Sequence, residues 1–193
     1  MKTPGKPVRR SYKSKAAPRR VRYSVAVSLD GFIAGPKGEF DWIIMDSTLD
    51  FGALFKQFDT FLLGRRTFEV TRQGGAGGTT AGTQTIVFSR TLRQSDYPDV
   101  LITSEVTKTI SELKKKSGKD IWLFGGGELF RSVLDAGLID TIEVAVMPIL
   151  LSQGVPLLAA GARSPLLQLT ESKSLPSGTV LLSYKVAKKR KGR

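Results

Sequence analysis

The sequence predicts an α/β fold with a mostly parallel central sheet, helices on both faces and a C-terminal antiparallel hairpin. Short apolar runs alternate with segments whose apolar residues recur at helical spacing, which is the pattern of a parallel sheet covered by helices. Several of these runs stop at glycine immediately before a helix start. The last two extended segments alternate apolar and polar residues on either side of a turn, as the strands of a hairpin do.

The first part of the chain supplies an opening strand and a helix. Residues 22–34 alternate apolar and polar side chains up to a glycine turn, so we expect a strand there. Residues 46–58 place apolar side chains on one helical face, and Asp46, Ser47 or Asp50 is available as the N-cap.

The middle of the chain repeats the order of strand and helix. The buried run 61–63 leads directly into Gly64 and a helix start, and the glycine-rich segment 73–82 is expected to be a flexible loop. We expect Ser104 to cap a helix that ends near Lys116. Further buried strands are expected at residues 85–88, 100–102 and 120–124, and Ile110 and Leu113 are expected to face the core.

The last part begins with three glycines and ends with the hairpin. Gly125, Gly126 and Gly127 separate the strand at 120–124 from an amphipathic helix. The next expected strand is 142–146, and the hairpin strands are 166–173 and 178–186.

The net charge of +13 lies entirely at the two ends of the chain. Residues 1–22 hold nine Lys or Arg and residues 185–193 hold six, with no acidic residue in either segment. The remaining fifteen basic residues face all seventeen acidic ones, so the part between the ends is nearly neutral. We therefore expect a disordered basic tail at 1–20, one domain at 21–186 and a basic C-terminal tail at 187–193.

The composition limits the chemistry. There is no Cys, His or Asn among the 193 residues, which removes disulfides, thiol nucleophiles and imidazole catalysis, and we expect no metal site. A redox reaction carried by an organic cofactor fits this restriction. No apolar run approaches the roughly 20 residues of a membrane-spanning helix, and the N-terminus lacks the apolar segment of a secretory signal. We expect a cytoplasmic protein without a membrane partner, although an acid-free N-terminus is also compatible with an organelle transit peptide.

Three predicted strand ends carry groups that suit phosphate. These ends are residues 64–67, 89–91 and 125–127, which offer guanidiniums, hydroxyls or free backbone N–H groups. Ligands of open α/β sheets bind outside the carboxyl ends of the strands, so the three ends can converge on one phosphorylated dinucleotide such as NADPH. The alternative interpretation is that the arginines are solvated surface charges and the glycines only allow tight packing.

In this order and spacing the segments resemble the dihydrofolate reductase superfamily, in particular the branch related to the reductase domain of bacterial riboflavin biosynthesis. The similarity covers roughly residues 22–186. It is carried by residues 23–34, 63–69, 87–90, 124–130, 135–140 and 154–158.

The resemblance implies a cofactor site. Backbone groups of Ala26 and Ile33 would hold the nicotinamide carboxamide of NADPH. The phosphate and adenosine end would be taken by Arg65, Arg66, Thr67, Ser89 and Arg90, the pyrophosphate by Gly126 and Gly127, and Gly64, Gly125, Glu128 and Leu129 would complete the set.

The substrate end of the resemblance is less complete. Asp50 is the nearest equivalent of the family's catalytic carboxylate and Asp46 is a second candidate, but either can instead be a helix N-cap. Trp42 would line the substrate pocket or pack in the core, and Asp30 would lie at the substrate side.

The predicted function is NADPH-dependent hydride transfer to a C=N or C=O group of a pterin- or pyrimidine-like heterocycle. A homodimer is possible in such a family. The alternatives are a nucleic-acid-binding protein that acts through its basic tails with the domain as scaffold, and a cofactor-binding domain without turnover.

Overall fold

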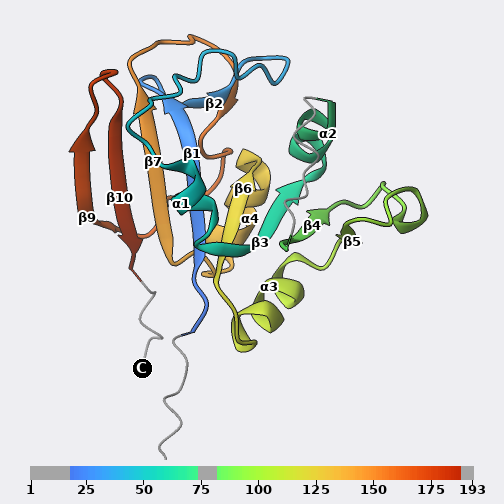
Figure 1. The fold of residues 1–193 in the computed structure, drawn as a ribbon. Coiled ribbons are helices and arrows are strands. Elements are labelled where there is room, and N and C mark those ends of the chain that lie inside the picture. Colours follow the sequence, from blue (N-terminus) through green and yellow to red (C-terminus); the bar gives the residue numbers. More distant parts are fainter. Residues whose placement is uncertain (1–17, 74–81, 188–193) are drawn as a thin grey trace, which may run out of the picture.

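The computed structural model describes residues 18–73 and 82–187, and within these ranges the chain forms one eight-stranded sheet with helices on both faces (Figure 1). Most of the predicted tails and of the glycine-rich segment 73–82 lie outside the described residues. The strands are β1 (Val21–Ser28), β2 (Phe32–Ala34), β3 (Phe58–Gly64), β4 (Gln84–Phe88), β5 (Leu101–Thr103), β6 (Asp120–Gly125), β7 (Thr141–Met147), β8 (Val155–Pro156), β9 (Leu167–Ser174) and β10 (Val180–Val186), and the helices are α1 (Phe51–Phe55), α2 (Arg65–Gln73), the 3₁₀ turn η1 (Gln94–Asp96), α3 (Val106–Lys115) and α4 (Gly127–Asp135).

The strand order confirms the predicted sheet. The order is β5-β4-β3-β6-β1-β7-β10-β9. Neighbours from β5 to β7 pair in parallel, whereas β10 pairs antiparallel with both β7 and β9. The last two strands are therefore the predicted hairpin at one edge of the sheet. The short strands β2 and β8 form a separate antiparallel pair that the sequence pattern did not predict.

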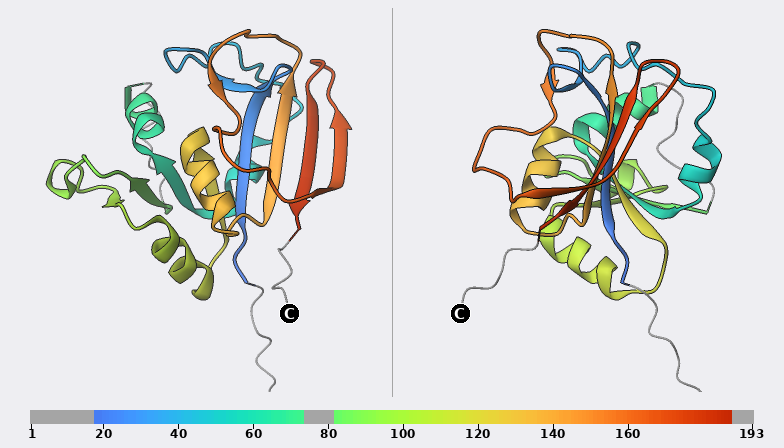
Figure 2. Two further views of the ribbon diagram at one scale, coloured as in Figure 1. Left: turned by 180° about the vertical axis from the view of Figure 1, so that it is seen from behind. Right: turned by 90° about the vertical axis from the view of Figure 1, so that its left-hand side faces the viewer.

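Two apolar clusters pack against the two faces of the sheet. One cluster takes its helical residues from α3 and α4, including Ile110 and Leu113, which confirms their inward orientation. The other takes Phe68 from α2, with Leu54 and Phe55 of α1 packed against it. The two views of Figure 2 show α1 and α4 on opposite sides of the strands. Within the described residues, no helix is long and apolar enough to cross a membrane.

The predicted helix at 46–58 is mostly wrong. Only Phe51–Phe55 is helical, with Asp50 as its N-cap. Asp46 instead forms a local turn, because its Oδ1 accepts the N–H of Thr48 at 2.8 Å and its carbonyl accepts the N–H of Leu49 at 3.1 Å. Short polar side chains compete in this way with helical hydrogen bonds. The result is a short α1 of five residues.

Two boundaries also differ from prediction. The N-cap position of α3 is Glu105 rather than Ser104, because the Oγ1 of Thr103 already accepts the N–H of Glu105. The fold begins before Val21, since Arg19 is only 5% exposed and bonds Asp59 and the Oγ1 of Thr60. The last residues of the predicted tail 1–20 therefore belong to the domain.

Candidate functional site

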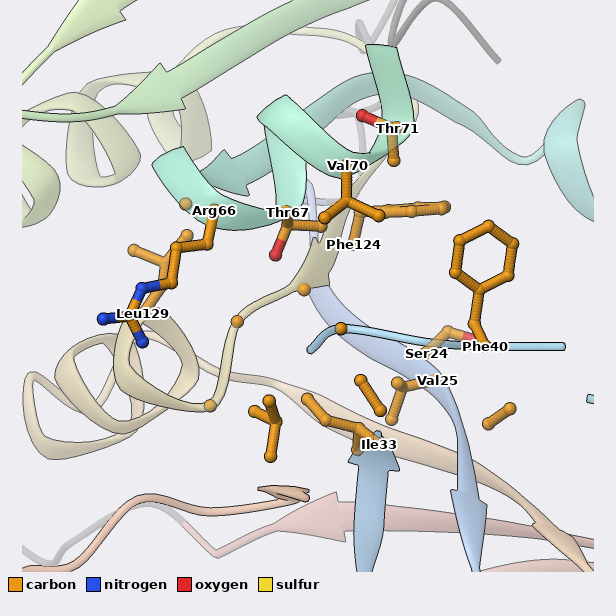
Figure 3. Close-up of a pocket in the computed structure, with 18 of the residues that line it drawn as sticks. Ser24, Val25, Ile33, Phe40, Arg66, Thr67, Val70, Thr71, Phe124 and Leu129 are labelled. Atoms are coloured by element: carbon orange, nitrogen blue, oxygen red, sulfur yellow. The ribbon is translucent and has the colours of Figure 1, made fainter. Parts of the chain in front are cut away.

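One large cleft crosses the carboxyl-terminal edge of the sheet and is lined by α1, α2 and the start of α4 (Figure 3). Its volume is about 1780 Å³. A pocket for one drug-sized ligand typically has roughly 300–1,000 Å³. The cleft therefore has room for a dinucleotide and a second small molecule side by side, at the edge where open α/β sheets bind ligands.

The junction between β3 and α2 forms one wall of the cleft. Gly64 ends the strand and Arg65 starts the helix without an intervening loop. The N–H groups of a first helical turn have no intrahelical partner, so those of α2 are placed at the cleft. Gly64, Arg65, Arg66 and Thr67 all line it, and Figure 3 shows the Thr67 hydroxyl directed toward the glycine turn before α4.

The three glycines at the junction of β6 and α4 are required for two different structural reasons. Gly126 has a φ of 98°, a conformation that L side chains rarely adopt. A Cβ on Gly125 would lie 3.1 Å from Cγ2 of Thr67, and one on Gly127 would lie 2.6 Å from the carbonyl oxygen of Pro156. Tight packing thus explains Gly125 and Gly127. The orphan N–H groups at the start of α4 still provide a place for an anion.

The start of α4 adds two residues that were predicted from the resemblance. Glu128 and Leu129 both line the cleft. Glu128 places a carboxylate in the first turn of the helix, where it competes with any bound anion. A contribution of Glu128 to phosphate binding would therefore come from its backbone N–H.

The end of β4 supplies a third element of this wall. Ser89 and Arg90 line the cleft. The Oγ of Ser89 accepts the N–H groups of Thr91 at 3.1 Å and Leu92 at 3.0 Å, which closes the turn after the strand. Arg90 lies in that turn and is exposed.

The three arginines of the cleft are not equivalent. Arg65 is paired with Glu69 through N···O distances of 3.0 and 3.1 Å. Arg66 and Arg90 have no carboxylate partner among the described residues. Arg66 and Leu129 both line the cleft (Figure 3). Two guanidiniums without a carboxylate partner in the described part of the chain thus stand at the end of the cleft that also holds two helix N-termini.

The floor of the cleft comes from β1 and β2. Ala26 and Ile33 line it, and Figure 3 shows Ile33 directed into the cavity. Their expected contact with a nicotinamide stays a prediction. The turn between these strands is tied by the Oγ of Ser28, which accepts the N–H of Phe32 at 2.9 Å. Asp30 reinforces the same turn, because its carboxylate accepts the N–H groups of Leu151 and Ser152.

Asp50 is both a cap and part of the cleft wall. Its Oδ1 accepts the N–H of Ala53 at 2.8 Å, and the residue lines the cleft beside α1. The two interpretations of Asp50 are therefore compatible, since one carboxylate oxygen caps the helix and the other remains available.

Asp46, Asp30 and Trp42 do not line the cleft. Asp46 is 7% exposed and accepts the N–H of Ser177 at 3.2 Å, which ties its loop to the β9–β10 hairpin turn. Hydrogen bonds from Thr48 and then Ser177 hold the pKa of Asp46 well below its usual range. The pKa of Asp30 is also lowered, chiefly by the bond from Ser28.

The Trp42 indole donates to the carbonyl of Glu39 at 3.1 Å. Trp42 therefore supports its own loop, and the tryptophan of the cleft is Trp122 on β6, whose indole donates to the carbonyl of Ser24 at 2.9 Å.

Glu143 on β7 was also missed by the sequence analysis. It lines the cleft at the α1 side. The alternation along β7 could have identified it, because Glu143 is the charged member of the face that also carries Ala145.

Comparisons with known proteins agree with the geometry. A family model described as the RibD C-terminal domain matches residues 19–181. The uncharacterized protein YyaP of Bacillus subtilis is 33% identical over 177 residues, covering 86% of this chain and 94% of YyaP. A solved structure from Shewanella sp. PV-4, whose name assigns it to riboflavin biosynthesis, has a TM-score of 0.74 at 25% identity and covers 89% of this chain and 99% of its own.

Two more distant solved structures share the fold. A Thermotoga maritima protein named as a diaminohydroxyphosphoribosylaminopyrimidine deaminase and 5-amino-6-(5-phosphoribosylamino)uracil reductase has a TM-score of 0.65 at 17% identity, with 88% of this chain and 57% of that chain covered. Dihydrofolate reductase from Enterococcus faecalis, solved with NADP(H), has a TM-score of 0.63 at 16% identity, with 86% and 96% covered.

Proposed function

Because the chain belongs to the RibD C-terminal domain family, we propose that it is an NADPH-dependent reductase that transfers hydride to a pterin- or pyrimidine-like heterocycle. The fold is of the reductase type. The observation that carries the finer proposal is the cleft itself, which is large enough for two ligands and has three arginines and two helix N-termini at one end.

The cofactor would lie along the wall built by α2, β4 and α4. The helix N-termini at Arg65 and Gly127 offer backbone donors for the pyrophosphate. Arg66 and Arg90, which have no carboxylate partner among the described residues, offer charge-assisted bonds for phosphate. The nicotinamide would then reach the floor at Ala26 and Ile33.

The substrate would lie between that floor and α1. Bound NADPH supplies hydride, so the chain needs to hold two flat rings face to face and to exclude water. Trp122 and Phe124 give the site apolar walls. The Asp50 oxygen that does not cap α1 would hold or relay the proton that balances the hydride.

The test is direct. Purified full-length protein is titrated with NADPH, and NADPH oxidation is then followed with dihydrofolate and with amino-substituted pyrimidines. We expect saturable NADPH binding and turnover with at least one heterocycle. Absence of NADPH binding would refute the reductase proposal, whereas binding without turnover across the panel would favour the cofactor-binding domain without activity.

The predicted partners need separate experiments. The basic tails lie almost wholly outside the described residues, so nucleic-acid contact stays a prediction from the sequence. Removing residues 1–17 and 188–193 should abolish retention on nucleic acid and leave NADPH binding unchanged. The homodimer and the cytoplasmic location also stay predictions, and light scattering tests the first of them.

A further inference from the structure

The charged residues of the cleft are divided between its two ends. Arg65, Arg66 and Arg90 stand at the end formed by α2, β4 and α4, together with the carboxylates of Glu69 and Glu128. The carboxylates of Asp50 and Glu143 stand at the end formed by α1 and β7, where no arginine lines the cleft among the described residues. Lys37 is the remaining basic residue that lines the cleft, among the residues that the structure describes. Lys37 is exposed on the loop after β2, where its N–H bonds Glu39 and the neighbouring Gly38 approaches Val70 of α2.

Glu143 is held in one orientation by a buried arginine. Arg22 is 8% exposed and contacts Glu143 with two bonds, from Nε to Oε1 at 2.7 Å and from Nη2 to Oε2 at 2.8 Å. The guanidinium is fixed in turn by Gln57, whose Oε1 accepts Nη1 at 2.6 Å, and by the ring of Phe58, whose centroid is 4.6 Å from Cζ. Such a bidentate pair is geometrically specific.

The held carboxylate can still accept another hydrogen bond. An ionised carboxylate has about four lone-pair sites. Arg22 occupies one on each oxygen of Glu143, and the hydroxyl of Thr141 approaches Oε1 at 3.3 Å. A site on Oε2 remains, and the Glu143 side chain is 19% exposed within the cleft lining.

The position of Glu143 suits the far edge of a single ring. Ala145 pairs with Ala26 across β7 and β1, and Glu143 lies two residues earlier on the same face. At the strand rise of about 3.3 Å per residue, Glu143 is about 7 Å deeper than Ala145. The neighbours of Glu143 on the two flanking strands are small, because Ser24 of β1 and Ser183 of β10 pair with it and also line the cleft.

We infer that Glu143, positioned by Arg22, is a specificity-determining residue that accepts a hydrogen bond from an amino group of the substrate and disfavours a phosphate at this end of the cleft. This inference rests on the proposed function. The natural substrate is then an amino-substituted heterocycle without phosphate, which separates this chain from the Thermotoga protein named for a phosphoribosylamino substrate.

The test uses probes that differ in one chemical feature. Full-length protein saturated with NADPH is titrated calorimetrically with 2,4-diaminopyrimidine and with uracil, which present amino and oxo groups on the same ring. Cytidine and cytidine 5′-monophosphate form a second pair that differs by the phosphate. We expect 2,4-diaminopyrimidine to bind at least about tenfold tighter than uracil, and cytidine to bind tighter than its monophosphate.

Variants separate recognition from structure. Glu143→Gln should lower the affinity for 2,4-diaminopyrimidine at least about tenfold. It should also reduce the difference in affinity between cytidine and cytidine 5′-monophosphate, with NADPH affinity unchanged. Glu143→Asp keeps the charge opposite Arg22 and should lose the amino preference while still disfavouring the monophosphate, so it gives the result if the Gln variant does not fold. Glu69→Gln is the matched control, because Glu69 is also an arginine-paired carboxylate of the cleft but lies at the other end.

The outcomes distinguish the two proposals. Absence of NADPH binding by the wild-type protein would refute the proposed function. Normal NADPH binding with equal affinities for 2,4-diaminopyrimidine and uracil, or tighter binding of cytidine 5′-monophosphate than of cytidine, would overturn the role of Glu143. A folded Glu143→Gln or Glu143→Asp variant with the wild-type preference for 2,4-diaminopyrimidine would overturn it equally.

Discussion

Replacement of Arg90 by alanine should convert a protein that prefers NADPH into one that binds both nicotinamide cofactors alike. Arg90 lines the cleft in the turn after β4 and has no carboxylate partner among the described residues, so its charge is available for the extra phosphate of NADPH. A hydrogen bond to a charged group contributes about 1.5–3 kcal/mol, and about 1.4 kcal/mol corresponds to tenfold in affinity. Because Arg90 is exposed, solvent screening favours the lower end, or about tenfold.

The other arginines of the cleft provide matched controls. Arg66 lies in the first turn of α2 and lines the cleft (Figure 3), at the end where the pyrophosphate common to both cofactors is proposed to bind. Arg66→Ala should therefore weaken NADPH and NADH by similar factors. Arg65 is already paired with Glu69, so Arg65→Ala should have the smallest effect of the three.

Dissociation constants for NADPH and NADH should be measured by fluorescence titration at low and high salt. The wild-type preference for NADPH should shrink at high salt, because the contact is exposed. Equal dissociation constants for the two cofactors in the wild type would refute this reasoning. An Arg90→Ala variant that weakens both cofactors by the same factor would show that Arg90 does not read the extra phosphate.

Three further predictions concern single side chains. Gly126→Val should abolish NADPH binding and lower the free energy of unfolding by about 1–3 kcal/mol, because the branched residue must adopt a φ of 98°; titration and chemical denaturation measure the two effects. Asp50→Ser should lower the hydride-transfer rate by roughly two to four powers of ten and leave NADPH affinity within about twofold, since serine preserves the cap of α1. Asp46→Asn should flatten the acid side of the stability profile: the lowered pKa of Asp46 stabilises the fold above about pH 4, the ordinary value of the group, and this contribution is lost as pH falls toward the folded pKa.

Each of these has an outcome that contradicts it. A folded Gly126→Val protein with unchanged NADPH affinity would show that this glycine serves only the backbone conformation of the turn. Wild-type turnover and stability in Asp50→Ser would restrict Asp50 to capping and leave water as the proton donor. Parallel stability profiles of wild type and Asp46→Asn between pH 2 and pH 5, roughly the range over which such a carboxylate titrates, would show that the bonds from Thr48 and Ser177 do not stabilise the charged form.

The parts of the fold that depend on local pattern were predictable from the sequence. The strand ends at Gly64 and Gly125 follow from apolar runs that stop at glycine, and the structure places both at the cleft. The length of α1 was not predictable in the same way, because apolar residues at helical spacing from 46 to 58 compete with the turn that Asp46 forms.

The substrate side of the site shows a second limit. Trp42 and Trp122 are equally good candidates by residue type, and only the tertiary arrangement puts Trp122 at the cleft and Trp42 outside it. The pairing of Glu143 with Arg22 joins residues 121 positions apart. Sequence spacing alone does not place such distant residues together, although the alternation of each strand assigns both to one face.

The position of β1 in the sheet has a consequence for folding of the chain during synthesis. Val21 pairs with Ile121 on one side, and its N–H bonds Asp140 at a separation of 119 residues on the other. Both neighbours of β1 in the sheet are therefore synthesised about one hundred residues after it. β3 and β4 can pair soon after they are synthesised. β1 has no strand to pair with, and its apolar face stays uncovered, until β6 and β7 have been synthesised. Closure of loops this long slows folding, so β1 is the segment on which we expect chaperones to act.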